Sequence, residues 1–396
     1  MSEQALPEEL RGEGSARLSR ILDEARVVVT VGSGGVGKTT TAAALAIAAA
    51  RRGRKAAVLT IDPARRLAQA LGLEQLGNEP RPLPADLVAP GGVDAMMLET
   101  AEAFDDLISR LVPDEERRQR LLHNRLYQVI ARHLGGTHEY MAVEKLYELT
   151  RDGTYDLVVL DTPPSVNALD FLDAPQRLMH FFSDRVTRFF IKRSEDTKKG
   201  LIARLRDRAG ELAISILGKA FGDGFMEEVS DFATAFQGLF GAFRERGVAI
   251  DELLRGKSTS FLVVSAADPV RVTEALEFAG ALKRLGIQPG GFILNRVHLA
   301  ATDDATPLSA ALVHEALGEE PGAAAVDPQG LAEALDTARR VRSSMARRDR
   351  AGITSMARAQ GRDQLVVVPE LATEVGDRSA VEHMLEALGA PTRAGD

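Results

Sequence analysis

The residues best suited to chemistry in this chain lie in one glycine-rich stretch, "GSGGVGKTTT", which runs from Gly32 to Thr41. Gly32, four further residues and Gly37-Lys38-Thr39 fit the phosphate-loop pattern of glycine, four residues, glycine, lysine and serine or threonine. Glycines let the backbone amides of such a loop point inward, so the loop and the following helix start bind an anion. We expect Lys38 to lie across the β and γ phosphates of a nucleotide and the Thr39 hydroxyl to bind Mg²⁺.

The elements on either side of this loop support the same chemistry. The apolar run 26–31 precedes it and the helical pattern "TTTAAALAIAAARR" follows it, which is the strand, loop and helix order that phosphate binding requires. A glycine-rich turn that fits the pattern by chance is the alternative, and this context argues against it. We expect the nucleotide to contact a continuous part of the loop, namely Gly34, Gly35, Val36, Gly37, Lys38, Thr39 and Thr40.

Four other residues lie at the ends of apolar runs and extend the candidate site. Asp62, Asp161 and Pro369 each end such a run, and Asn295 lies near the end of another. In open α/β sheets ligands bind outside the carboxyl ends of the strands, so all four fall on the same rim as Lys38. An acid in this position can also serve only as a cap for the next helix.

The neighbours of the two acids suggest different roles. Thr162-Pro163-Pro164 follow Asp161, and we expect this carboxylate in the outer coordination sphere of the Mg²⁺ that Thr39 binds. Asp62 would lie beside the γ phosphate, where it can position or activate the attacking water. Asp62 and Lys38 are therefore the predicted catalytic residues.

Asn295 is the candidate for contact with the base, and Pro369 is a further candidate for contact with the nucleotide. A guanine site needs a carboxylate to accept the ring N–H and the exocyclic amine, and residues 296–298 contain no acid. The amide of Asn295 can pair with adenine instead. The sequence therefore favours ATP over GTP.

Six short runs rich in Val, Ile and Leu barely alternate with polar residues, which is typical of buried parallel strands. Helical patterns separate them, and strand and helix in alternation predict an α/β protein with a doubly wound, mostly parallel sheet. The six runs are 26–31, 56–61, 156–161, 261–266, 291–297 and 364–369, and 94–99 is a weaker seventh.

Two stretches interrupt this alternation. About 171–255 is helical throughout in pattern, and about 299–330 is rich in Ala, Pro, Gly and Asp, which is typical of a loop-heavy insertion. A basic helical pattern follows the second stretch. We expect a charged arm at 1–25, a nucleotide-binding core at 26–170 and 256–390, an inserted all-helical subdomain at 171–255 and a disordered tail at 391–396.

Composition limits the other possibilities. Lys and Arg number 49 against 57 Asp and Glu, a net charge of −8, so no general attraction to nucleic acid or anionic lipid is expected. The absence of cysteine rules out disulfides and thiolate metal sites. The charged first 25 residues do not fit a signal peptide, and "AAALAIAAA" is too short to span a bilayer, so we expect a soluble cytoplasmic protein.

Five motifs in order resemble one known family. They are "GSGGVGKTTT", "DPARRL", "DTPPSVNALDFL", "NRVH" and "VPELATEVGD", and they are similar to the arsenite-pump ATPase family over about 26–388. This family includes the eukaryotic ATPase that targets tail-anchored membrane proteins, and the resemblance is closest to bacterial single-loop members described as anion-transporting ATPases. It implies a deviant P-loop NTPase sheet with a helical subdomain inserted after the Asp161 segment. It also implies paired nucleotide sites, so this chain would form a homodimer or a heterodimer with a related ATPase.

The chain departs from this family at two chemical features. The family has a lysine at the position of Ser33, which reaches the partner's phosphates, and serine has neither the charge nor the length for this. The arsenite site and the zinc clamp of family members use cysteines, so arsenite sensing and zinc are not expected.

The helical stretch is the remaining place for specificity. Eleven of the fifteen Phe lie between Phe171 and Phe243, and a groove for an apolar helix would use such a surface. The apolar positions of "FMEEVSDFATAFQGLFGAF" follow steps of three and four, which more often indicates a core: Phe225, Val229, Phe232, Phe236, Leu239 and Phe243.

Three functions fit these observations. The leading one is an ATPase dimer that opens and closes with the nucleotide and moves an apolar client or drives a membrane partner through its helices. The second is a weakly catalytic or non-catalytic ATP-binding subunit paired with a paralogue that carries the lysine. The third is a positioning ATPase that acts on DNA or membrane, for which "EALGAPTRAGD" offers neither a basic nor an amphipathic tail.

Replacing Ser33 with lysine tests the importance of the missing cation. A cation supplied in trans to phosphoryl transfer is typically worth about 10³–10⁵ in rate, so wild type alone should turn over ATP slowly and Ser33→Lys should raise the rate strongly. Steady-state phosphate release by each protein alone measures this. Brisk wild-type turnover that Ser33→Lys leaves unchanged would contradict the expectation and make Arg65 and Arg66 the next residues to mutate.

Overall fold

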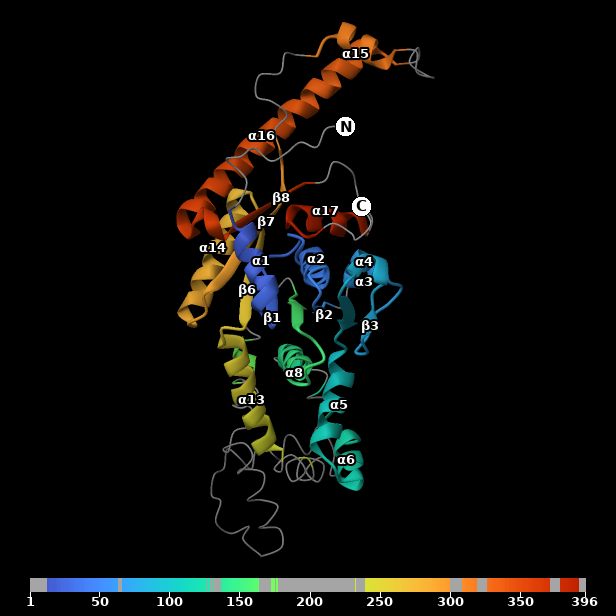
Figure 1. Cartoon of the computed structure of the whole chain (residues 1–396), viewed down its shortest axis with the longest axis vertical. Helices are drawn as coiled ribbons and strands as arrows, with labels where there is room; N and C mark the ends of the chain where they lie inside the picture. The colour runs from blue at the N-terminus through green and yellow to red at the C-terminus, as the bar shows by residue number, and fades with distance from the viewer. Residues whose placement is uncertain are drawn as a thin grey trace, which may run out of the picture.

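A central sheet of eight strands organises the computed structural model (Figure 1), which describes residues 13–62, 66–125, 127–128, 131, 137–163, 172–174, 176, 232, 239–299, 308–318, 326–370 and 378–391. The strands are β1 (Val27–Val31), β2 (Lys55–Thr60), β3 (Arg81–Pro82), β4 (Gly92–Met97), β5 (Leu157–Asp161), β6 (Thr259–Ala266), β7 (Pro289–Val297) and β8 (Leu365–Pro369). Their order is β3-β4-β2-β5-β1-β6-β7-β8, and every pair is parallel except the antiparallel β3–β4 pair.

The predicted fold class is confirmed. All seven predicted strands are present, each with ends within two residues of the expected ones. The unpredicted β3 is a two-residue, exposed edge strand, too short to leave an apolar signal. The sequence runs are apolar without interruption because alternate residues of each strand enter two different cores. In β1, for example, Val27 and Val29 face one core and Val28 faces the other.

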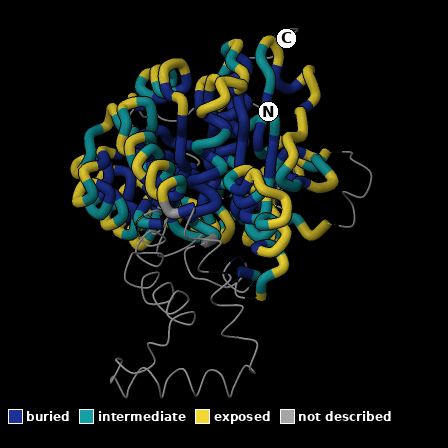
Figure 2. Tube along the Cα trace, turned by 90° about the horizontal axis from the view of Figure 1, so that it is seen from below, coloured by how far each residue is buried: buried dark blue, intermediate teal, exposed yellow. Residues whose placement is uncertain are grey.

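Helices cover both faces of the sheet and leave its strands as the most buried part of the chain (Figure 2). One face packs against α1 (Ser15–Glu24), α2 (Lys38–Ala50), α3 (Arg66–Leu71), α4 (Ala85–Val88) and α17 (Arg378–Ala387). The other packs against α5 (Thr100–Leu111), α6 (Glu115–Leu122), α8 (Thr137–Arg151), α13 (Phe240–Arg255), α14 (Pro269–Arg284) and the inner part of α16 (Pro328–Gln360).

Three stretches interpreted as arm, loop or tail contain defined structure. Residues 15–24 form α1, whose Leu18 and Leu22 are buried, so the interpretation of 1–25 as a charged arm is wrong for this part. The loop-heavy stretch contains α15 (Ala310–Leu317). At the C-terminal end, Arg51 Nη1 donates to the carbonyl of Pro391 at 3.3 Å, and the remaining tail residues lie outside the described chain.

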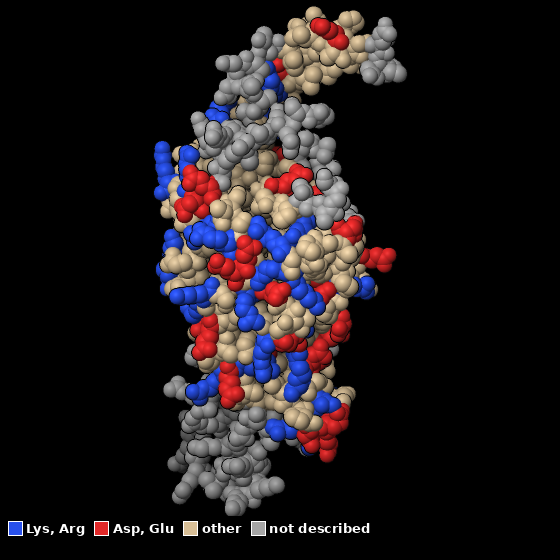
Figure 3. All heavy atoms as spheres, in the orientation of Figure 1, with Lys and Arg blue, Asp and Glu red and all other residues tan. Residues whose placement is uncertain are grey.

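The basic helical pattern is the long helix α16. It contacts α14 near its C-terminal end and extends beyond the sheet to carry α15 at its outer end (Figure 1). Acidic and basic side chains intermix over the face of the core shown in Figure 3. No helix in the described part of the chain combines the length and apolar character that crossing a bilayer needs.

The described members of the phenylalanine stripe belong to the core. Phe232, Leu239 and Phe243 are all buried, and the ring of Phe243 lies 6.4 Å from Phe104 and 5.9 Å from Tyr140 between centroids. These three residues therefore follow the core interpretation rather than the groove. Most of 171–255, including Phe225, Val229 and Phe236, lies outside the described residues.

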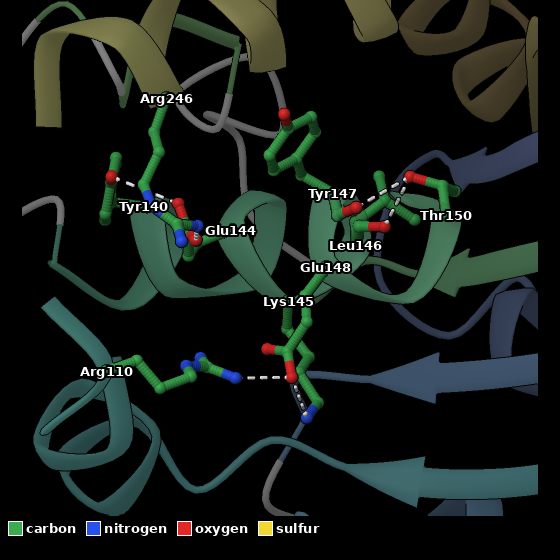
Figure 4. A network of polar contacts seen from close by, with 9 residues as sticks. All are labelled: Arg110, Tyr140, Glu144, Lys145, Leu146, Tyr147, Glu148, Thr150 and Arg246. Carbon is green, nitrogen blue, oxygen red and sulfur yellow. Dashed lines mark hydrogen bonds and ion pairs between the residues drawn. The ribbon is translucent and has the colours of Figure 1, made fainter. Parts of the chain in front are cut away.

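A buried ion pair joins α8 to α13 beneath this aromatic cluster (Figure 4). Glu144 is fully buried, accepts a hydrogen bond from Tyr140 at 3.2 Å and pairs with Arg246 of α13. Burial raises the pKa of Glu144, and Arg246 opposes this rise. On the other side of α8, Arg110 of α5 lies 2.5 Å from the half-buried Glu148.

Removing Arg246 should leave a buried carboxylate without its cation. Breaking a buried pair in this way typically costs about 3–5 kcal/mol, so Arg246→Met should lower the free energy of unfolding by an amount of this order. Arg110→Met, whose partner Glu148 is more exposed and also contacts Lys145, is the matched control and should lose about 1 kcal/mol or less.

The loss of stability in Arg246→Met should also grow as the pH rises. The raised pKa means that native Glu144 retains its proton at pH values where the unfolded chain has lost it. The variant therefore loses stability as the pH rises above 4.5, the ordinary pKa of a Glu. Urea unfolding at pH 5 and pH 8 measures this change. A deficit equal at both pH values would contradict a charged, unpaired Glu144.

Candidate nucleotide site

The glycine-rich stretch forms a tight loop between β1 and the start of α2. Gly32, Gly35 and Gly37 have φ values of 148°, 77° and 92°, in the region that disfavours L side chains. A Cβ on Gly32 would lie 2.0 Å from the carbonyl oxygen of Val264 on β6, and one on Gly37 would lie 2.3 Å from the amide nitrogen of Asn295 on β7. Glycine is therefore required by both conformation and close packing at Gly32 and Gly37.

Lys38 begins α2 and folds back over this loop. Its side chain is buried, and its Nζ donates to the carbonyl of Ser33 at 2.9 Å. Burial lowers the pKa of Lys38, and the charges of Asp161 and Asp62 oppose this effect. The structure thus brings Lys38 and the two predicted acids into one electrostatic site.

Asp161, the last residue of β5, is held by two hydroxyl groups. Its Oδ2 accepts from Thr39 at 2.8 Å and from Thr60, the last residue of β2, at 2.9 Å. Its Oδ1 is buried and has no hydrogen-bond partner among the described residues. Burial raises the pKa of Asp161 to about 6, although both hydroxyl groups and Lys38 lower it.

This arrangement fits Mg²⁺, a hard cation that prefers oxygen ligands. Thr39 offers a hydroxyl oxygen, and Asp161 offers a buried carboxylate oxygen that no group in the described part of the chain satisfies. A carboxylate that is costly to ionise becomes more stable beside a divalent cation. No group of three or more His, Asp or Glu within the described ranges could hold a metal.

Asp62 follows β2 and is also close to the loop. Its backbone N–H donates to Thr60 Oγ1 at 3.2 Å, so one threonine contacts both acid positions. Its Oδ2 lies 3.6 Å from Nη1 of the exposed Arg66. Arg65, the other nearby cation suggested by the sequence, lies outside the described residues.

His138 supports the Asp62 segment and was not singled out from the sequence. Its Nε2 donates to the carbonyl of Ile61 at 3.0 Å, and its Nδ1 contacts the hydroxyl of Thr100 at the start of α5. Because a carbonyl can only accept, Nε2 carries the proton and Nδ1 accepts from Thr100. A lone histidine in a helical pattern gives no local signal of such a role.

Asn295 and Arg296 hold the opposite side of the loop. The amide nitrogen of Asn295 donates to the carbonyl of Val36 at 2.9 Å, and its Oδ1 accepts from the backbone N–H of Arg296 at 2.9 Å. Arg296 is the only non-glycine residue in the described ranges with positive φ, 57°, and its Nη1 donates to the carbonyl of Gly35 at 3.1 Å. Asn295 thus supports the loop itself and keeps one amide hydrogen and one lone pair for a base.

Pro369 lies beside this segment at the end of β8. It pairs with Val297 in the sheet, and the N–H of Glu370 donates to the carbonyl of Val297 at 2.9 Å. Residues 296–298 contain no acid, but the neighbouring strand brings the carboxylate of Glu370 to this side of the sheet. That carboxylate is paired with His298 at 2.9 Å.

The side chain of Ser33 contacts α14, whereas its carbonyl accepts from Lys38. Arg271 Nη1 lies 2.9 Å from Glu274 Oε2. The Arg271 hydrogen bond lowers the pKa of the exposed Glu274, and a hydrogen bond from the Ser33 side chain acts in the same direction. The position expected to carry a lysine is therefore next to a carboxylate and an arginine of the same chain.

The parallel sheet, the glycine loop at a helix start and the acids at two strand ends define the P-loop NTPase class. The sequence pattern of the anion-transporting ATPase family matches residues 25–312, which is most of the chain. The chain therefore belongs to this family, in agreement with the resemblance found in its motifs.

Individual relatives match over shorter stretches. An uncharacterized protein of Streptomyces coelicolor is 33% identical over 154 residues, 39% of this chain and 38% of the relative. The ATPase get3 of Aspergillus terreus is 29% identical over 151 residues, 38% and 43% of the two chains, and the ATPase GET3 of Malassezia globosa 29% over 163 residues, 41% and 46%. The matched stretches span about two fifths of these relatives.

The raised pKa of Asp161 predicts a pH-dependent stability difference. Between pH 3.8, the ordinary pKa of an Asp, and about pH 6, the unfolded chain loses this proton while the native protein keeps it. Folding therefore becomes less favourable as the pH rises through this range. Asp161→Asn cannot titrate. Its unfolding free energy relative to wild type should therefore rise by about 2 kcal/mol between pH 4.5 and pH 7.5 in metal-free buffer.

Urea unfolding of both proteins at the two pH values checks this difference. Thr162→Ser, a neighbour that does not titrate, is the control and should show no such change. A wild-type to Asp161→Asn difference independent of pH would contradict the buried, hard-to-ionise carboxylate.

Proposed function

We propose that the protein binds ATP with Mg²⁺ and hydrolyses it, and that the nucleotide controls the pairing of two such sites in a dimer. The observation that carries this proposal is the convergence of Lys38, Asp62 and Asp161 at the phosphate loop, where one buried carboxylate oxygen of Asp161 has no partner among the described residues. Family membership supports it independently. Asn295 beside the loop supports adenine as the base.

The chemistry of phosphoryl transfer requires mainly positioning and charge. Lys38, anchored at the loop, would neutralise negative charge on the β and γ phosphates, and the loop amides would bind the same oxygens. Thr39 and Asp161 would hold Mg²⁺, which would supply positive charge next to the phosphates. Asp62, with its main chain fixed by Thr60 and His138, would orient the attacking water.

The same residues suggest how the nucleotide state would reach the helical region. His138 binds the carbonyl next to Asp62 at one end of α8, and Glu144 further along α8 pairs with Arg246 of α13. Helix α13 forms the C-terminal end of the predicted all-helical stretch 171–255. A shift of the Asp62 segment would therefore move α8 against α13, and we propose that an apolar client or a membrane partner is handled through this region.

A second candidate is a weakly catalytic subunit that pairs with a paralogue carrying the loop lysine. The observation that favours it is the serine at position 33. Its side chain hydrogen-bonds to Glu274, and it offers no cation to a partner. Glu274 would also attract a lysine placed at position 33. The Ser33→Lys comparison is therefore best made in a Glu274→Gln background as well as in wild type.

Two substitutions separate binding from hydrolysis. Asp62→Asn should retain ATP·Mg²⁺ binding but lose about 10²-fold or more in turnover, since binding rests on the loop and hydrolysis on the oriented water. Lys38→Ala should lose ATP binding, because the loop loses the charge that contacts the phosphates. Calorimetry with ATP and Mg²⁺ measures affinity, and phosphate release measures turnover.

Asp152→Asn, in an exposed turn far along the chain from the loop, is the control and should change neither quantity. Undiminished turnover in Asp62→Asn would reduce Asp62 to a helix cap. Near-normal ATP affinity in Lys38→Ala would remove the phosphate-loop interpretation.

A further inference from the structure

His298 lies between two carboxylates from distant parts of the chain. Its Nδ1 is 2.7 Å from Oδ2 of Asp349 on α16, and its Nε2 is 2.9 Å from Oε2 of Glu370, which follows β8. The backbone N–H of His298 also donates to Asp349 Oδ2 at 3.0 Å. Asp349 is almost fully buried, whereas Glu370 is 44% exposed.

The chemistry of this arrangement requires a charged histidine. A carboxylate can only accept, so both ring nitrogens must carry protons when both contacts are made. The imidazolium then makes a charge-assisted hydrogen bond to Asp349, which is stronger than a neutral one, and an ion pair with Glu370. The other charged group at this cluster is Arg348, whose Nε lies 3.6 Å from the second oxygen of Asp349.

His298 and Glu370 are each close in sequence to a predicted nucleotide-binding residue. His298 lies three residues after Asn295, and Glu370 directly follows Pro369. The N–H of Glu370 donates to the carbonyl of Val297, so the two strand ends are also joined through the backbone. Helix α16 holds the same segment a second time, because Arg342 Nε donates to the carbonyl of Leu299 at 3.2 Å.

We propose that His298 is a positioning residue for the nucleobase, because it pins the ends of β7 and β8 to each other and to α16. The proposal deepens the proposed function and rests on it. His298 acts through Asn295 and Pro369 and does not contact the phosphate loop, where Lys38 and Thr39 act. Loss of the His298–Glu370 contact should therefore weaken the binding of a ligand that has a base and leave the affinity for a ligand that has only phosphates unchanged.

Two variants test the pin from its two sides. Glu370→Ala removes the exposed partner and is expected to fold. His298→Asn keeps a donor for Asp349 but cannot reach Glu370. Affinities for ATP and for inorganic triphosphate, each with Mg²⁺, are measured by calorimetry. Each variant should bind ATP roughly tenfold more weakly, the equivalent of one charge-assisted hydrogen bond, and should bind triphosphate as wild type does.

The double variant adds a further requirement. Because both substitutions break the same contact, His298→Asn with Glu370→Ala should lose no more ATP affinity than either alone. His314→Asn on α15, a histidine away from this cluster, is the control and should leave both affinities unchanged.

Other results would overturn the pin. Unchanged ATP affinity in both single variants would show that the base side does not depend on it, and equal losses for ATP and triphosphate would show a general structural role. Failure of wild type to bind either ligand would instead contradict the proposed function itself.

Discussion

The site depends on one buried carboxylate. Asp161 ends β5, and its Oδ2 accepts hydrogen bonds from the hydroxyl groups of Thr39 in the first turn of α2 and Thr60 at the end of β2. The phosphate loop, its helix and two central strands are thereby held in register by one side chain. Burial raises the pKa of this side chain to about 6, so the arrangement is least stable when Asp161 is ionised without a cation. A bound cation would offset this cost.

Packing around the loop gives this carboxylate a fixed environment. Gly32 touches the β6 backbone and Gly37 touches Asn295 of β7, at distances that no Cβ would allow. The loop is therefore pressed against the strands on one side while Asp62 and Asp161 approach from the other. On the base side, positive φ at Arg296, a conformation that costs about 1–3 kcal/mol in a non-glycine residue, is held by Asn295 and by the bond to Gly35.

Some of this arrangement could be predicted from the sequence because its signals are local. Buried parallel strands leave uninterrupted apolar runs, and the topology then places Asp62, Asp161, Asn295 and Pro369 on one rim without further information. Thr60, His138, Arg296 and the His298–Glu370 pair could not be predicted in the same way. Their partners are far away in the sequence. His298 and Asp349 are 51 residues apart, and Thr60 and Asp161 are 101 residues apart. Helix α1 was missed because frequent charges conceal two buried leucines four residues apart.

The remaining question is how a loop with one lysine presents its amides to an anion. Each peptide unit of the loop has a carbonyl that needs a partner of its own. Four of these carbonyls accept hydrogen bonds from side chains. The donors are Lys38 to Ser33, Arg296 to Gly35, Asn295 to Val36 and Thr41 to Gly37. With these carbonyls engaged, the loop is fixed in a form that leaves its N–H groups for phosphate oxygens. Two of the four partners, Lys38 and Arg296, are cations, so the side chains that hold the loop in shape also place positive charge beside it.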